Sequence, residues 1–263
     1  MAFASFILYA FLLLQFSIGS HGLEMNMIKP EDDQPRHPSP DLSLNVFFKI
    51  TDLYLGNKIQ IYLASKKDST PTQLLSKEEA DSIPFSLSKL PHLLEYFSFS
   101  NTSSQAKAMQ TTLKQCEVKP IGGEVKTCVT SLKSMMEMTR HFFGMVKPKV
   151  LTTKILSSKH TLYQNYTIVE KPKEVNTSKV IACHTMAYPY MVYYCHGHKG
   201  HMTRLFKVAL GGDNKERINA IAVCHMDTSK WDRDHVSFRI LGVRRGSSPV
   251  CHVIPVDNFV WFA

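Results

Sequence analysis

The amino-acid sequence predicts an α+β domain, in which a helical middle segment packs on an antiparallel C-terminal sheet that carries four Cys-His pairs. Three observations predict this class. Apolar residues recur at helical spacing between positions 76 and 143, short runs of β-branched and aromatic residues follow Pro148, and four Cys-His dipeptides lie within or beside those runs. The roughly 240 residues that remain without the first 20 or so suit one large domain or two small ones, and we expect residues 46–263 to form one domain.

The first 22 residues are typical of a secretory signal peptide. An apolar run of about 13 residues, from Phe6 to Ile18, precedes several small residues. This run is shorter than the roughly 20 residues that a membrane-spanning helix needs. Residues 23–45 contain four prolines and few large apolar side chains, which predicts a flexible leader. We therefore expect cleavage between Ser20 and Leu23, transport along the secretory route, and no transmembrane segment in the mature chain.

The first elements of the domain follow from apolar clusters and one capping motif. Residues 46–50 and 58–63 are apolar runs on either side of a Gly56-Asn57 turn signal, which favours a β-hairpin. Ser76 and Glu79 match the capping box of a helix N-terminus. A short helix is therefore expected to begin at Ser76.

Three further helices are predicted by apolar residues spaced three or four positions apart. Their patterns are Leu87, Leu90, Leu94 and Phe97; Ala106, Met109, Leu113 and Cys116; and Val129, Leu132, Met136 and Phe143. Pro91 predicts that the first of these helices is kinked or begins near it. After Pro148, short runs are predicted to be strands at residues 149–155, 166–169, 180–182, 191–194, 205–210, 220–223, 236–240 and 259–262.

The chain is basic, with 31 Lys and Arg against 22 Asp and Glu, none of them in the first 22 residues. In an exported protein this charge favours acidic cell-wall polysaccharides or membrane headgroups over nucleic acid as partners. A solvated, lysine-rich surface without a partner is the alternative. Three sequons, at Asn101, Asn165 and Asn176, predict N-glycosylation in the same compartment.

The cysteines predict disulfide bonds, because an even number in an exported chain favours oxidation over metal thiolates. They are Cys116, Cys128, Cys183, Cys195, Cys224 and Cys251. We expect Cys116 to pair with Cys128 across their short loop and the other four to pair among themselves.

Four of these cysteines are each followed by a histidine. The histidines are His184, His196, His225 and His252, the gaps after the dipeptides are 10, 27, 25 and 8 residues, and Trp261 ends the series. Since successive side chains of a strand point to opposite faces, the cysteines can close disulfides on one face while the histidines gather on the other. Four neutral imidazoles suit Cu(II) or Zn(II). The alternative is that the histidines only form hydrogen bonds within the sheet.

Other residues near the dipeptides could complete such a site. His198, His201 and His235 could add ligands. Asp227 and Asp234 could orient a ligating imidazole, although surface carboxylates are a simpler interpretation.

The spacing of the Cys-His pairs and the final tryptophan resemble the BURP domain family of plants, which these features define. The resemblance covers about residues 45–263 and includes Phe47-Phe48 at the domain start and Gly123-Glu124 in the middle. Lys133 departs from it, because relatives usually carry an acidic residue there. With a short leader and no repeat region, the chain is most similar to the seed-protein-like (unknown seed protein-like) subgroup.

The resemblance implies three functions. The first is a secretory protein of the apoplast, cell wall or protein storage vacuole, with a structural or regulatory role in seed or tissue development or stress responses and no catalytic cycle. The second is a copper-dependent oxidative cyclase that joins a Tyr or Trp side chain to the backbone of a separate peptide, with the four histidines holding the metal. The leader, residues 23–45, contains neither Tyr nor Trp, which argues against self-cyclisation there and leaves open a core peptide inside the domain. The third is a non-catalytic pectin-binding wall protein.

Overall fold

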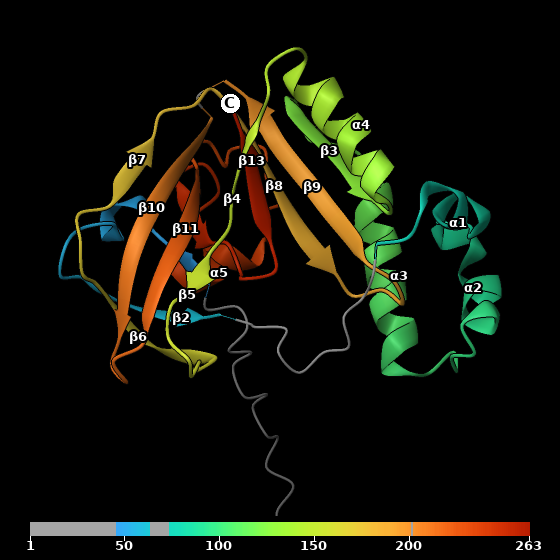
Figure 1. The fold of residues 1–263 in the computed structure, drawn as a ribbon, viewed down its shortest axis with the longest axis horizontal. Helices are drawn as coiled ribbons and strands as arrows, with labels where there is room; N and C mark the ends of the chain where they lie inside the picture. Colours follow the sequence, from blue (N-terminus) through green and yellow to red (C-terminus); the bar gives the residue numbers. More distant parts are fainter. Residues whose placement is uncertain (1–45, 64–73, 201) are drawn as a thin grey trace, which may run out of the picture. The chain divides into compact units, whose positions relative to one another are not determined.

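The computed structural model describes residues 46–63, 74–200 and 202–263. The predicted signal peptide and leader lie outside the described residues, as does His201. The described residues form one compact unit, which consists of helices and two antiparallel sheets (Figure 1). Within the described ranges, none of the helices has the length and apolar character to cross a membrane.

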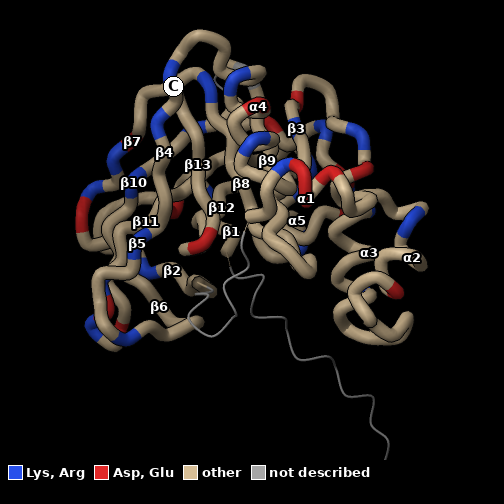
Figure 2. The backbone as a smooth tube through the Cα atoms, turned by 45° about the vertical axis from the view of Figure 1, so that its right-hand side comes forward, with Lys and Arg blue, Asp and Glu red and all other residues tan. Residues whose placement is uncertain are grey.

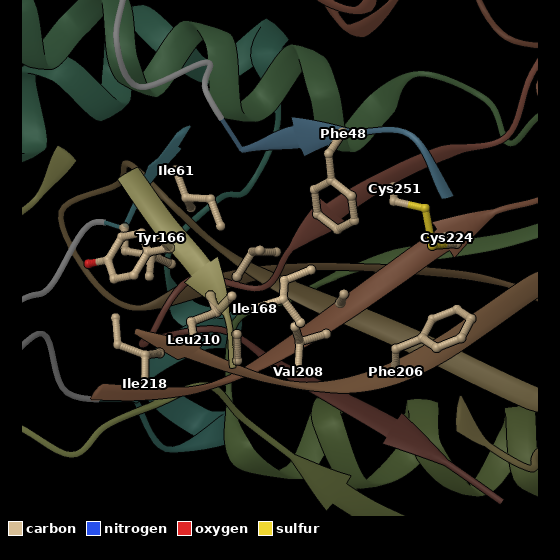
Figure 3. Packing of buried hydrophobic residues seen from close by; sticks show 14 residues of the cluster. Phe48, Ile61, Tyr166, Ile168, Phe206, Val208, Leu210, Ile218, Cys224 and Cys251 are labelled. Carbon is tan, nitrogen blue, oxygen red and sulfur yellow. A yellow bond between two sulfur atoms is a disulfide. The ribbon is translucent and has the colours of Figure 1, made fainter. Parts of the chain in front are cut away.

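The larger sheet has eight strands in the described part of the chain. Its main path is β1 (Phe47–Phe48), β12 (Val250–Val253), β11 (Arg217–His225), β10 (Thr203–Gly212), β6 (Tyr163–Ile168) and β2 (Lys58–Tyr62), with β5 (Lys154–Ile155) paired to β11 and β7 (Lys173–Val175) paired to β10. Figure 3 shows the core on this sheet, in which Phe48, Tyr166 and Leu210 pack with the Cys224–Cys251 disulfide.

The smaller sheet carries the other two Cys-His pairs. Its order is β3 (Glu124–Val129), β9 (Val192–Lys199), β8 (Lys179–Met186), β13 (Phe259–Phe262) and β4 (Lys149–Leu151). Helix α4 (Leu132–Phe143) contributes Met135 and Phe142 to a cluster with Cys183 and Cys195 of this sheet. A third cluster joins Val180 of β8 to Val223 of β11, so the two sheets pack against each other.

The other helices bear out most of the helical patterns. They are α1 (Lys77–Ser82), α2 (Leu90–Tyr96) and α3 (Ser104–Glu117), with 3-10 turns at Ile50–Asp52 and Leu87–Lys89. The Ser76 hydroxyl accepts a hydrogen bond from Glu79 N while the Glu79 carboxylate accepts one from Ser76 N, which confirms the capping box. Pro91 lies in the first turn of α2, where a missing N–H removes no helical hydrogen bond.

Two strand predictions at the start of the domain and after Pro148 need correction. The predicted hairpin of residues 46–63 is wrong, because β1 pairs with β12 and β2 pairs with β6. Gly56 does adopt a positive φ in a turn, but the 3-10 turn before it leads the chain away from β1. Residues 149–155 form two strands in different sheets, since the Thr152 and Thr153 hydroxyls bind the backbone of residues 254–258 between them.

Two further predictions assigned the wrong element type. Residues 236–240 form helix α5 (Val236–Leu241), which is capped by the His235 side chain and ends at Gly242 in the left-handed region. Val129, predicted to be helical, ends strand β3, so the middle of the chain is not uniformly helical. Pairing with the distant strand β9 decides the structure at Val129, and capping decides it at residues 236–240.

Candidate functional site

Three disulfides hold the strands that carry the site. Cys116–Cys128 joins α3 to β3, as predicted. The remaining bonds are Cys183–Cys195 and Cys224–Cys251, each between residues that face each other directly on paired strands. All four of these sulfurs are buried in apolar clusters. The Cys-His dipeptides are thereby fixed at adjacent positions on both sheets.

The four histidines of the dipeptides form a closed ring, two from each sheet. Ring centroids are separated by 5.4 Å for His184–His196, 5.5 Å for His184–His252, 5.5 Å for His225–His252 and 5.8 Å for His196–His225. This ring, called the histidine ring below, lies on the opposite side of each strand from the disulfides, as strand alternation dictates. It forms where the two sheets meet.

The histidine ring lines a cavity of about 420 Å³. Its other walls include His198, His235, the aromatic residues Phe47, Tyr194 and Trp231, and the charged residues Lys119, Glu124, Lys126 and Asp232. Lys126 Nζ lies 5.6 Å from the centre of the Tyr194 ring. The cavity therefore combines neutral aromatic surface, ionisable groups and imidazoles within one space.

Burial favours the neutral form of His184, His198, His225, His235 and His252. Burial, followed by the neighbouring histidines, places the pKa of His184 and His225 well below the usual value, and burial lowers the pKa of His252 to about 4. His225 and His252 are almost fully buried, whereas His184 is partly open to the cavity. The pKa values of His198 and His235 are also lowered, mainly by burial. Neutral imidazole is the form that donates a lone pair to a metal.

Two of the rings already have the spacing of ligands on one ion. The Nε2 atoms of His225 and His252 lie 3.4 Å apart, within hydrogen-bonding distance of each other. Two nitrogens bound at about 2.05 Å are roughly 3.4 Å apart on a tetrahedral ion such as Zn(II) and roughly 2.9 Å apart as neighbours on a square-planar Cu(II), so copper would draw these two rings slightly closer. His225 Nδ1 is buried without a hydrogen-bond partner in the described chain. Across the described ranges, however, no three His, Cys, Asp or Glu side chains are placed to hold one ion together, so a third ligand requires a ring to rotate.

Asp227 and Asp234, considered as partners of the imidazoles, match the simpler interpretation as surface carboxylates, and other residues contact the rings. Asp227 and Asp234 are exposed, and within the described residues neither forms a hydrogen bond or ion pair with a histidine. Glu124 Oε1 instead lies 3.3 Å from His196 Nδ1, and Asn258 Nδ2 lies 3.1 Å from His184 Nδ1. Burial alone would raise the pKa of Glu124, but its contacts with His196 and Ile121 N outweigh burial and lower it. Glu124 was overlooked because strand β3 was not predicted.

The two tryptophans have different places. Trp261, the signature residue, packs in the cluster with Phe142 and Cys183 and is not among the residues that line the cavity. Trp231, which the sequence did not single out, lies against the site, with its ring 5.1 Å from His225 and 4.6 Å from His235. The signature tryptophan therefore supports the fold rather than the site.

The predicted sequons lie on the surface. Asn101, Asn165 and Asn176 are all exposed, and Asn165 donates a hydrogen bond to Asp213. Their glycosylation stays a prediction.

Comparison with known proteins identifies the family. A BURP domain model matches residues 46–263. The chain is 46% identical over 228 residues to BURP domain protein USPL1 of Arabidopsis thaliana, covering 84% of this chain and 81% of the relative. It is 46% identical over 227 residues to BURP domain-containing protein BNM2A of Brassica napus, covering 84% and 80%. It is 34% identical over 229 residues to BURP domain protein RD22 of Arabidopsis thaliana, covering 86% and 57%. With its four Cys-His pairs and Trp261, the chain belongs to the BURP domain family.

Proposed function

We propose that the chain is a secretory BURP-domain protein whose histidine ring binds one copper(II) ion. The observation that carries this proposal is the closed ring of four imidazoles, contributed by two disulfide-linked strand pairs. Imidazole suits copper, and copper(II) binds nitrogen sites more strongly than the other divalent metals of its row. Oxidised cysteines leave the imidazoles as the ligands, since disulfide sulfur is not a thiolate.

The biological role proposed with this site is structural or regulatory, in plant seed or tissue development or in stress responses. Family membership supports it. Three disulfides suit an oxidising compartment, for which the apoplast, the cell wall and the protein storage vacuole are the candidates. In this role the copper site would stabilise the contact between the two sheets, because a ligand set drawn from both sheets links them.

A second candidate function is oxidative cyclisation of a separate peptide. The observation that favours it is the cavity beside the histidine ring, whose aromatic walls could hold a Tyr or Trp side chain of such a peptide. Bound copper would supply one-electron oxidation there. Trp231 and Tyr194 would orient the aromatic side chain, while Lys126 could bind a carboxylate of the peptide.

Pectin binding has less support from the arrangement of charges. Lys and Arg are spread over the two sheets and the helices, with Asp and Glu among them (Figure 2). A polyanion is bound best by a groove or face of one sign. We therefore place this function behind the other two.

Metal analysis of the purified mature protein tests the first proposal. We expect one copper ion per chain after dialysis against copper(II), and no binding by the His225→Ala, His252→Ala double variant. Absence of copper binding by the folded, oxidised wild-type protein would contradict it.

The cyclase proposal needs a separate readout. The copper-loaded protein is incubated in air with a peptide that contains Tyr or Trp, and mass spectrometry should show loss of two hydrogens in a product that resists aminopeptidase. A copper-loaded protein that leaves every such peptide unchanged favours the non-catalytic role.

A further inference from the structure

His196 and His184, the two partly exposed rings of the site, contact a hydrogen-bond acceptor and a hydrogen-bond donor, respectively. His196 Nδ1 lies 3.3 Å from Glu124 Oε1. The other carboxylate oxygen accepts a hydrogen bond from Ile121 N at 3.1 Å, which fixes the position of the Glu124 side chain. A carboxylate can only accept, so in the neutral ring this contact favours the tautomer of His196 with its proton on Nδ1. The lone pair of Nε2 is then free.

His184 has a donor in the equivalent place. Asn258 Oδ1 accepts hydrogen bonds from Thr185 N at 3.0 Å and from Thr185 Oγ1 at 3.1 Å, which fixes the orientation of the buried amide. The Asn258 NH₂ group therefore faces His184 Nδ1 at 3.1 Å. Because an NH₂ group can only donate, Nδ1 accepts and the neutral ring carries its proton on Nε2.

We infer that Glu124 and Asn258 are positioning residues that hold His196 and His184 in opposite tautomers. The consequence for copper binding rests on the proposed function. His196 offers Nε2 to a metal without losing a proton, whereas His184 offers only Nδ1, in competition with Asn258. These two imidazoles are thus unequal, and His184 is a weaker ligand than His196. Partners of ligating imidazoles commonly alter metal affinity by about 10- to 100-fold.

The tautomers can be measured in the metal-free protein. Long-range ¹H–¹⁵N correlation spectra at neutral pH show which ring nitrogen of each histidine carries the proton. We expect Nδ1–H for His196 and Nε2–H for His184. The same tautomer in both rings would overturn the inference, whatever the outcome of copper binding.

Two reciprocal variants test the residues themselves. Asn258→Asp keeps an acceptor for Thr185 but replaces the donor that faces His184, so its Nδ1 should become protonated and its Nε2 free for copper. Glu124→Gln keeps an acceptor for Ile121 N and turns an NH₂ group toward His196, which should give the opposite change.

Copper affinity should follow the tautomers. We expect it to rise in Asn258→Asp and to fall about 10- to 100-fold in Glu124→Gln. Asp227→Asn, which removes a carboxylate that touches no histidine, is the matched control and should change neither readout. Unchanged tautomers in both folded variants would show that Glu124 and Asn258 do not position the rings. If the wild-type protein binds no copper, the proposed function fails while the tautomer result stands alone.

Discussion

The cysteine side and the histidine side of the same four dipeptides have opposite environments. Cys183 and Cys224 are fully buried in apolar clusters, each closed by a disulfide to a residue directly across the strand pair. The next residues, His184 and His225, face a cavity that also contains charged and aromatic groups. A one-residue step along a strand therefore separates the part of the molecule that stabilises the fold from the part available for chemistry.

The largest loss of stability is expected on the face of the strands that carries the cysteines. Phe142 of α4 is buried in the cluster that contains Cys183 and Cys195. Phe142→Ala should lower the free energy of unfolding by about 3–5 kcal/mol, because it removes a large buried side chain and leaves a cavity. Urea unfolding measures this. The exposed Met136→Ala in the same helix is the control and should change stability little. Equal losses in both variants would contradict the packing described.

Removal of the Cys224–Cys251 disulfide should cause the next largest loss of stability. The bond closes a loop with a sequence separation of 27. The double variant Cys224→Ala, Cys251→Ala should lose about 3.5 kcal/mol by the chain-entropy estimate, and its secretion should fall. Thermal melts and secreted yield measure both. A double variant as stable as the wild type would show that pairing of β11 with β12 does not depend on the bond.

On the histidine side the effects should fall on binding more than on stability. His225→Ala should abolish copper binding while reducing stability by about 1–2 kcal/mol, since the ring borders a cavity rather than close-packed atoms. Equilibrium dialysis beside thermal melts separates the two. If the variant binds copper as tightly as the wild type and melts far lower, His225 is a core residue and the metal proposal fails.

The smallest change in stability is expected for the surface carboxylates that the sequence placed near the Cys-His pairs. Asp227→Asn should change the free energy of unfolding by less than about 0.5 kcal/mol, as is usual for surface substitutions. Asp227 is exposed and its carboxylate accepts a hydrogen bond from Ser229 N. A large loss of stability would mean that this local contact matters more than its exposure suggests.

The sequence was sufficient to predict the structure where a rule that acts between near neighbours in the chain decides it. Strand alternation placed the cysteines and histidines of each dipeptide on opposite faces, and the capping box placed the start of α1. It was insufficient where partners distant in sequence decide. Pairing of β1 with β12 and of β3 with β9 leaves no local signal. The helix of residues 236–241 was predicted to be a strand for a different reason, since its caps, His235 and Gly242, are adjacent in sequence and were not recognised beside the apolar run.

The same distinction holds for the site. The histidine ring follows from the dipeptides, but its partners come from other segments. Glu124 reaches His196 because β3 pairs with β9, and Asn258 reaches His184 because the chain turns before β13. Trp231 lies in a loop without periodicity, so its place beside His225 could not be predicted.

Copper(II) titration followed by electron paramagnetic resonance tests whether the histidine ring is a copper site. We expect one equivalent to bind to the oxidised wild-type protein and to give a spectrum with couplings to imidazole nitrogens. The double variant His225→Ala, His252→Ala should give only the signal of free copper. Imidazole-coupled copper in that double variant, or none in the wild type, would contradict the assignment of the histidine ring as the metal site.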